Sequence, residues 1–173
     1  MTKIEAGWDQ LIAAAKLYFQ GESLIAVHGL AASAVQVFDD LSKGTPYEDY
    51  NLIGHMMSPF PPEQRARVIR EFRKPQNFIK HADRDRDESL TLKASHTEFL
   101  LLCGVFLAGT LASECWANSL RKDPPILFAY QIWFCKEYPE VGGLDLDQQH
   151  WELLLVLLPK MFPFIPPLSP TCT

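Results

Sequence analysis

Asn77 and His81 are the two residues whose types and spacing best suit chemistry on a ligand. They lie four residues apart in the stretch Gln76-Asn77-Phe78-Ile79-Lys80-His81. If that stretch is helical, the two side chains share one face. Histidine titrates near neutral pH and can act as a general acid or base, while an amide beside it can orient a substrate oxygen. The same pair could instead hold a neighbouring helix through hydrogen bonds, so both roles stay open.

Positive charge is concentrated around this pair. Residues 62–80 hold six basic and two acidic side chains, a net charge of +4, whereas the whole chain carries −5. Guanidinium groups match phosphate oxygens in bidentate geometry, so the strip favours a nucleotide, an RNA backbone or an acidic protein partner. Basic faces of amphipathic helices are also commonly just solvated. The candidate ligand-binding residues are Arg70, Lys74, Lys80 and Arg84, and the candidate catalytic residues are Arg73, Asn77 and His81.

An all-helical layout, with a polar residue followed by a histidine at a helix start, resembles the HEPN superfamily. Here the two residues are Asn77 and His81, and the resemblance covers about residues 8–135. Members of that superfamily are helical bundles, often metal-independent ribonucleases or nucleotide-binding partners in toxin–antitoxin and defence systems. Its ribonucleases carry an arginine directly before the polar residue, where this sequence has Gln76. The resemblance implies either a non-catalytic member or a ribonuclease with His81 as acid–base group and Arg73 stabilising the phosphate.

Sequence motifs for metals and cofactors are lacking. Asp83, Asp85 and Asp87 match the first three ligands of a calcium loop, but Glu88 replaces the required glycine and Ala94 the final glutamate. The histidines show no zinc-hydrolase spacing, and the sequence has no phosphate-binding glycine loop, dinucleotide fingerprint or CxxC pair. We therefore expect neither a metal nor a cofactor.

Composition predicts one globular domain. The chain has 173 residues, of which 47% are hydrophobic and 21% charged, a balance typical of a domain with a packed core. Its first residues show no apolar signal segment. The longest apolar run, at residues 99–112, is shorter than the roughly 20 residues that cross a bilayer. We therefore expect a cytoplasmic protein without a membrane partner, with its four separated cysteines reduced and mostly buried.

The spacing of apolar residues predicts an all-α bundle of about five to seven helices. Helical periodicity covers residues 8–20, 22–43, 63–73, 92–118, 124–138 and 146–158. Pro75 is expected to end the third of these helices, with a short segment over residues 76–82 after it. His28 lies on the apolar stripe of the second, which predicts a hydrogen-bonded core histidine. No run of period-two alternation predicts a sheet.

The predicted bundle occupies residues 1–158, and a proline-rich tail over residues 159–173 is expected to pack on it. The tail contains five prolines, which impose an extended backbone. The runs around residues 99–112 and 151–158 are apolar almost all round, which indicates burial on several sides or a subunit interface. A homodimer is the expectation that follows.

Three functions remain compatible with the sequence. The first is a binding or regulatory module that recognises a phosphate-bearing ligand, RNA or an acidic protein through the basic strip. The second is a metal-independent ribonuclease built on the same strip. The third is a structural or assembly protein in which Asn77 and His81 are buried clamps.

Overall fold

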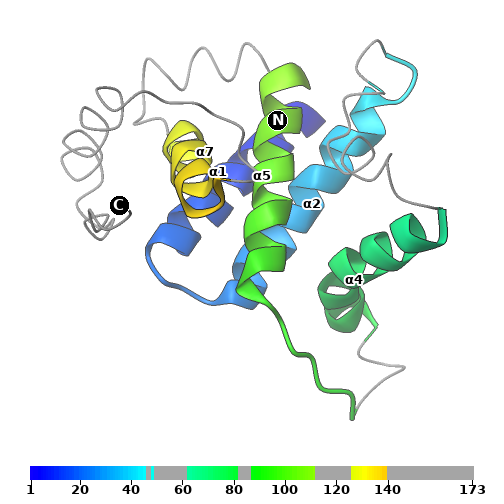
Figure 1. Cartoon of the computed structure of the whole chain (residues 1–173). Helices are drawn as coiled ribbons and strands as arrows, with labels where there is room; N and C mark the ends of the chain where they lie inside the picture. The colour runs from blue at the N-terminus through cyan, green and yellow to red at the C-terminus, as the bar shows by residue number, and fades with distance from the viewer. Residues whose placement is uncertain (46–47, 49–61, 82–86, 112–125, 140–173) are drawn as a thin grey trace.

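The computed structural model describes residues 1–45, 48, 62–81, 87–111 and 126–139, and these residues form five helices (Figure 1). No strand occurs in that part of the chain. The all-α class predicted from the sequence is therefore confirmed. The helices are α1 (Lys3–Phe19), α2 (Leu24–Ser42), α4 (Pro62–Lys80), α5 (Ala94–Leu111) and α7 (Ile126–Glu137).

Helix α1 begins at Lys3, earlier than its predicted start at Trp8. The hydroxyl of Thr2 accepts the N–H of Glu5 at 3.1 Å, and the Glu5 carboxylate accepts the N–H of Thr2 at 2.6 Å. This capping box satisfies two donors that a helix start otherwise leaves unpaired. Apolar periodicity starts only at Trp8 and could not indicate a first turn built by capping. The predicted stop at Gly21 is confirmed, since its φ of 68° is the left-handed conformation that glycine favours.

Helix α5 occupies the centre of the bundle, with α7 on one side and α2 on the other (Figure 1). It also packs against α1. Because helices surround it, its buried side chains follow one another along the sequence instead of forming a single stripe. The buried hydrophobic residues of α5 are Leu100, Leu101, Leu102, Cys103, Val105, Leu107 and Ala108.

Gly104 marks the closest approach of α5 to its neighbours. A Cβ atom at this position would lie 2.5 Å from Cδ2 of Leu11 on α1 and 3.3 Å from Cγ2 of Val35 on α2. Leu11 is fully buried and has little room to move away. A side chain at position 104 would therefore force Leu11 to shift where these three helices meet.

A buried carboxylate joins α5 to α1 and to the end of α7. Glu98 is only 7% exposed, and it accepts hydrogen bonds from the Tyr18 hydroxyl at 2.6 Å and the Tyr138 hydroxyl at 2.5 Å. The Tyr130 hydroxyl donates to the backbone carbonyl of Glu98 at 2.8 Å. Burial, followed by the bond to Glu98, raises the pKa of Tyr18 far above its ordinary value, so this phenol stays protonated as a donor. The polar atoms of Glu98 are thereby satisfied inside the core.

The break predicted at Pro75 is wrong, because α4 continues through it to Lys80. Proline has no N–H to donate to the carbonyl four residues earlier and typically costs a helix interior about 3 kcal/mol. Pro75 is buried, and the ring of Phe72 lies with its centroid 5.4 Å from those of both His96 and Phe99 near the start of α5. Packing of this inner face offsets the free-energy cost of the proline. The sequence pattern contains no information about this packing between helices.

Several predicted segments lie outside the described residues. They are residues 112–118, the helix over residues 146–158 and the proline-rich tail over residues 159–173. The homodimer stays a prediction. It is inferred from two apolar segments, of which one is α5, and the other helices of this chain already bury most of α5. The second segment lies outside the described residues. Its direct measurement is the molar mass of the purified protein in solution.

One helix, α2, is long and apolar enough to cross a membrane by length and composition alone. Core helices of soluble proteins pass the same test. Here α2 packs against α1, α4 and α5, and its stripe of buried residues includes Val27, Ala31 and Phe38. The cytoplasmic location stays a prediction.

Replacing Gly104 by alanine should destabilise the protein. A gain of roughly 0.5–1 kcal/mol from helix propensity opposes an overpacking cost of roughly 1–3 kcal/mol, so a net loss of about 1–2 kcal/mol is expected. Denaturant unfolding followed by circular dichroism measures it. Gly29→Ala in α2 is the matched control, because nothing lies within 4 Å of a Cβ atom there, and it should stabilise. Equal stabilisation by both substitutions would contradict the close approach at Gly104.

Candidate functional site

Continuity of α4 places Asn77 and His81 on one face. The N–H of His81 donates to the carbonyl of Asn77 at 2.9 Å, which is the bond that joins consecutive turns of an α-helix. Asn77 is exposed and His81 is half-buried. The two residues are therefore available at the surface, and the hypothesis that they are buried clamps is not supported.

An open groove of about 350 Å³ runs along this face. Four residues that line it follow the helical spacing of four, three and four, namely Arg70, Lys74, Asn77 and His81. Residues so spaced lie on one stripe of a helix. The structure thus brings together four of the residues that the sequence singled out. Its other lining residues are Glu71, Phe78 and Glu88.

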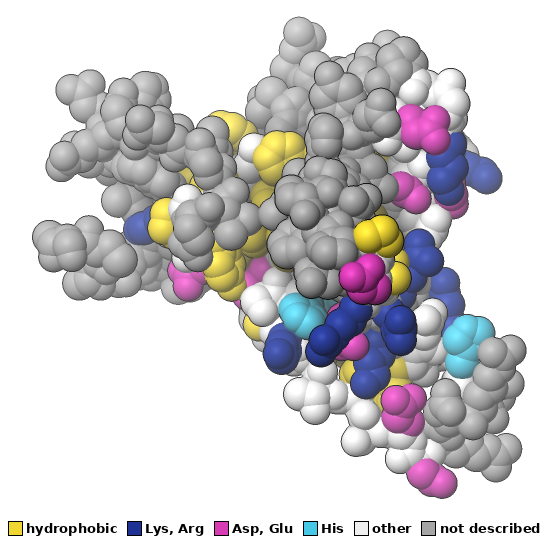
Figure 2. Space-filling view, turned by 45° about the vertical axis from the view of Figure 1, so that its right-hand side comes forward, with side chains coloured by type: hydrophobic (Ala, Val, Ile, Leu, Met, Phe, Trp, Pro, Cys, Tyr) yellow, Lys and Arg dark blue, Asp and Glu magenta, His cyan; other side chains and the backbone are white. Residues whose placement is uncertain are grey.

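The surface over α4 carries a cluster of Lys and Arg side chains (Figure 2). Arg70 and Lys74 are exposed, and neither forms an ion pair in the described part of the chain. Their positive charge is therefore not neutralised by a carboxylate of a described residue. Glu71 and Glu88 lie at the same groove and reduce its net positive charge.

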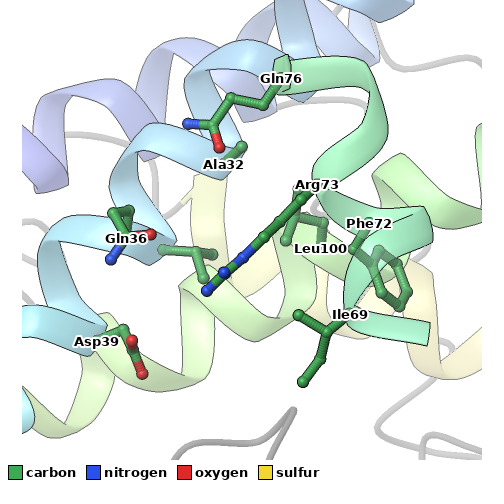
Figure 3. A pocket seen from close by; sticks show the side chains of 9 residues that line it. Ala32, Gln36, Asp39, Ile69, Phe72, Arg73, Gln76 and Leu100 are labelled. Carbon is green, nitrogen blue, oxygen red and sulfur yellow. The ribbon is translucent and has the colours of Figure 1, made fainter. Parts of the chain in front are cut away.

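The remaining candidates are placed differently. Arg73 lines a second pocket, between α4 and α2, with Ile69, Phe72 and Gln76 (Figure 3). It does not line the groove of Asn77 and His81. Lys80 is exposed and lines neither of these two hollows. Arg84 lies outside the described residues.

The helix α4 is held in place by His28, a buried histidine of α2. Its Nδ1 lies 3.0 Å from the hydroxyl of Thr97 on α5, and its Nε2 lies 3.1 Å from the backbone carbonyl of Phe72 on α4. A carbonyl only accepts, so Nε2 carries the hydrogen and Nδ1 accepts from Thr97. Both His28 and Thr97 are fully buried. The expectation of a hydrogen-bonded core histidine is confirmed, but its partner on α4 was not visible in the sequence.

Burial lowers the pKa of His28, because the charged imidazolium loses hydration inside the protein. The bond to the Phe72 carbonyl opposes this effect, and the nearby His96 adds to it. The neutral form of His28 is therefore favoured in the folded protein to a lower pH than for an ordinary histidine. Its single N–H is the one that the Phe72 carbonyl needs.

Among the described residues, no group of three or more His, Cys, Asp or Glu side chains could hold a metal ion. The aspartates of the residue 83–87 loop lie mostly outside the described part. No protein-family model, curated protein or solved structure matches this chain.

The stability of the wild-type protein should fall as the pH drops below about 6.5. In the unfolded chain His28 takes up a proton near its ordinary pKa of 6.5, whereas in the folded protein its pKa is lower, so protonation favours unfolding. For each pH unit below 6.5, the free energy of unfolding falls by up to about 1.4 kcal/mol, until the pH reaches the pKa of His28 in the folded protein.

The measurement is urea unfolding of wild type and His28→Gln between pH 8 and 5. The glutamine variant cannot titrate at this position, so its stability should depend less steeply on pH. The other histidines are common to both proteins and cancel in the comparison. If the free energy of unfolding depended on pH equally steeply in both proteins, His28 would not be the source of the pH dependence.

Proposed function

We propose that this protein is an RNA-binding module whose α4 groove contacts the sugar–phosphate backbone. The supporting observation is the single row of Arg70, Lys74, Asn77 and His81 along an open face. Arginine and lysine supply the affinity for phosphate, and the amide and imidazole can hydrogen-bond to ribose hydroxyls or base edges. The surrounding protein is acidic overall, so attraction to a polyanion is confined to this face.

The length of the row favours a polymer over a small nucleotide. With a rise of 1.5 Å per residue, Arg70 and His81 are separated by about 16 Å along the helix axis. The groove is open, whereas sites for small ligands usually enclose most of the ligand surface. Phe78 also lines the groove, and an aromatic ring next to cations is typical of surfaces that bind single-stranded nucleic acid.

The ribonuclease alternative needs a cation that stabilises charge on the phosphate near His81. Arg73 lines the other pocket, so Arg70 or Lys74 would have to take this role. Binding requires no such catalytic geometry, which is why we place it first. The assembly alternative loses its main support because Asn77 is exposed.

Removing two cations from the groove should weaken RNA binding and reduce its dependence on salt. For the double variant Arg70→Gln with Lys74→Gln, the slope of log K against log salt should become shallower by about 1.4, since each phosphate contact on a single strand contributes about 0.7. Fluorescence anisotropy with a labelled single-stranded RNA, over a range of KCl concentrations, measures this slope.

The matched control is Lys3→Gln with Lys16→Gln, which removes the same charge from exposed positions of α1. If both double variants weaken binding equally, the attraction is non-specific and the α4 groove is not the site. The bound RNA should also be recovered intact. Cleavage by wild type that is lost in His81→Ala would replace the binding proposal with the ribonuclease.

A further inference from the structure

The pocket between α2 and α4 is separate from the proposed RNA groove and has different chemistry. Its cavity volume is about 110 Å³, and it opens to solvent on one side. Its inner surface is apolar and contains Val35 of α2, Phe72 of α4 and Leu100 of α5. Val35 and Leu100 are themselves buried, so the pocket extends down to the core of the bundle.

Arg73 provides the positive charge of this pocket. Its side chain extends from α4 across the hollow toward α2 (Figure 3). It forms no ion pair in the described part of the chain. A guanidinium beside an apolar wall can pair with an anion while the wall removes the rest of the ligand from water.

The opposite side of the pocket limits the charge of that anion. Asp39 of α2 lies there beside Gln36, and the Asp39 carboxylate is 3.7 Å from the Lys43 ammonium. The amide nitrogen of Gln36 is already engaged, since it donates to Asp40 at 3.0 Å. One cation faces one carboxylate, so a dianionic phosphate would be repelled more than a singly charged group. A carboxylate carries one charge and matches the two parallel donors of arginine.

We propose that this pocket binds a small apolar monocarboxylate, with its carboxylate on Arg73 and its hydrocarbon part against Val35, Phe72 and Leu100. The cavity of about 110 Å³ is smaller than the roughly 300–1,000 Å³ of typical small-molecule sites, so the ligand has to be small and part of it stays at the open mouth. A small aromatic or branched aliphatic acid suits the walls of the pocket. The proposal does not depend on RNA binding, because Arg73 lies outside the α4 groove.

The test uses 3-phenylpropionate as the probe and ¹H–¹⁵N NMR titration of the full chain as the measurement. The acid should shift the resonances of residues around Val35, Arg73 and Leu100 in a saturable manner. Its neutral amide, 3-phenylpropionamide, should bind at least about tenfold more weakly, because it lacks the charge-assisted pair with Arg73. The dianion phenylphosphonate should also bind more weakly than the carboxylate.

Arg73→Gln is the diagnostic variant, and Arg70→Gln is its matched control on the same helix. The first should weaken binding of 3-phenylpropionate about tenfold or more, and the second should leave it within about twofold. Both positions are exposed, so neither substitution should unfold the protein.

Three results would overturn the proposal. The acid and its amide could bind equally well, the two arginine variants could weaken binding equally, or the probe could shift no resonance near the pocket. The first would make the pocket merely apolar, the second would make the attraction a general property of α4, and the third would leave the pocket without affinity for such acids.

Discussion

After its polar first turn, helix α5 is apolar on almost every side, and this constraint determines where the other helices lie. Each Å² of apolar surface removed from water contributes about 25 cal/mol, so a helix without a polar face is stable only when neighbours surround it. Helices α1, α2 and α7 provide this cover. Gly104 lets α1 and α2 come close enough to do so. The remaining described helix, α4, packs mainly on α2 and keeps a large polar surface.

Two adjacent residues near the start of α5 fasten opposite sides of the bundle. Thr97 bonds to His28, which in turn holds α4, whereas Glu98 accepts from Tyr18 of α1 and from Tyr138 after α7. Each of the polar side chains in these two clusters has a partner, so its loss of hydration is compensated. Because hydrogen bonds are directional, these contacts also fix the rotation of each helix about its own axis. Apolar packing alone would leave that rotation less well defined.

The attachment of α4 by one side creates two different surfaces on the same basic helix. Its inner side contributes Phe72 and Pro75 to the body. Arg70 points into an open groove, and Arg73, only three residues further on, lies over an apolar pocket against α2. One arginine thus borders an open polar groove, and the other borders a small apolar pocket.

Much of this arrangement follows directly from the residue pattern. Apolar periodicity predicted the all-α class and the approximate helix ranges, and helical spacing predicted that Asn77 and His81 share one face. Such predictions succeed because they depend on residues within three or four positions of one another. The continuity of α4 through Pro75, the partner of His28 and the separation of Arg73 from His81 were decided by tertiary structure. These features depend on contacts between helices distant in sequence, and no local spacing specifies which carbonyl, ring or wall a side chain will meet.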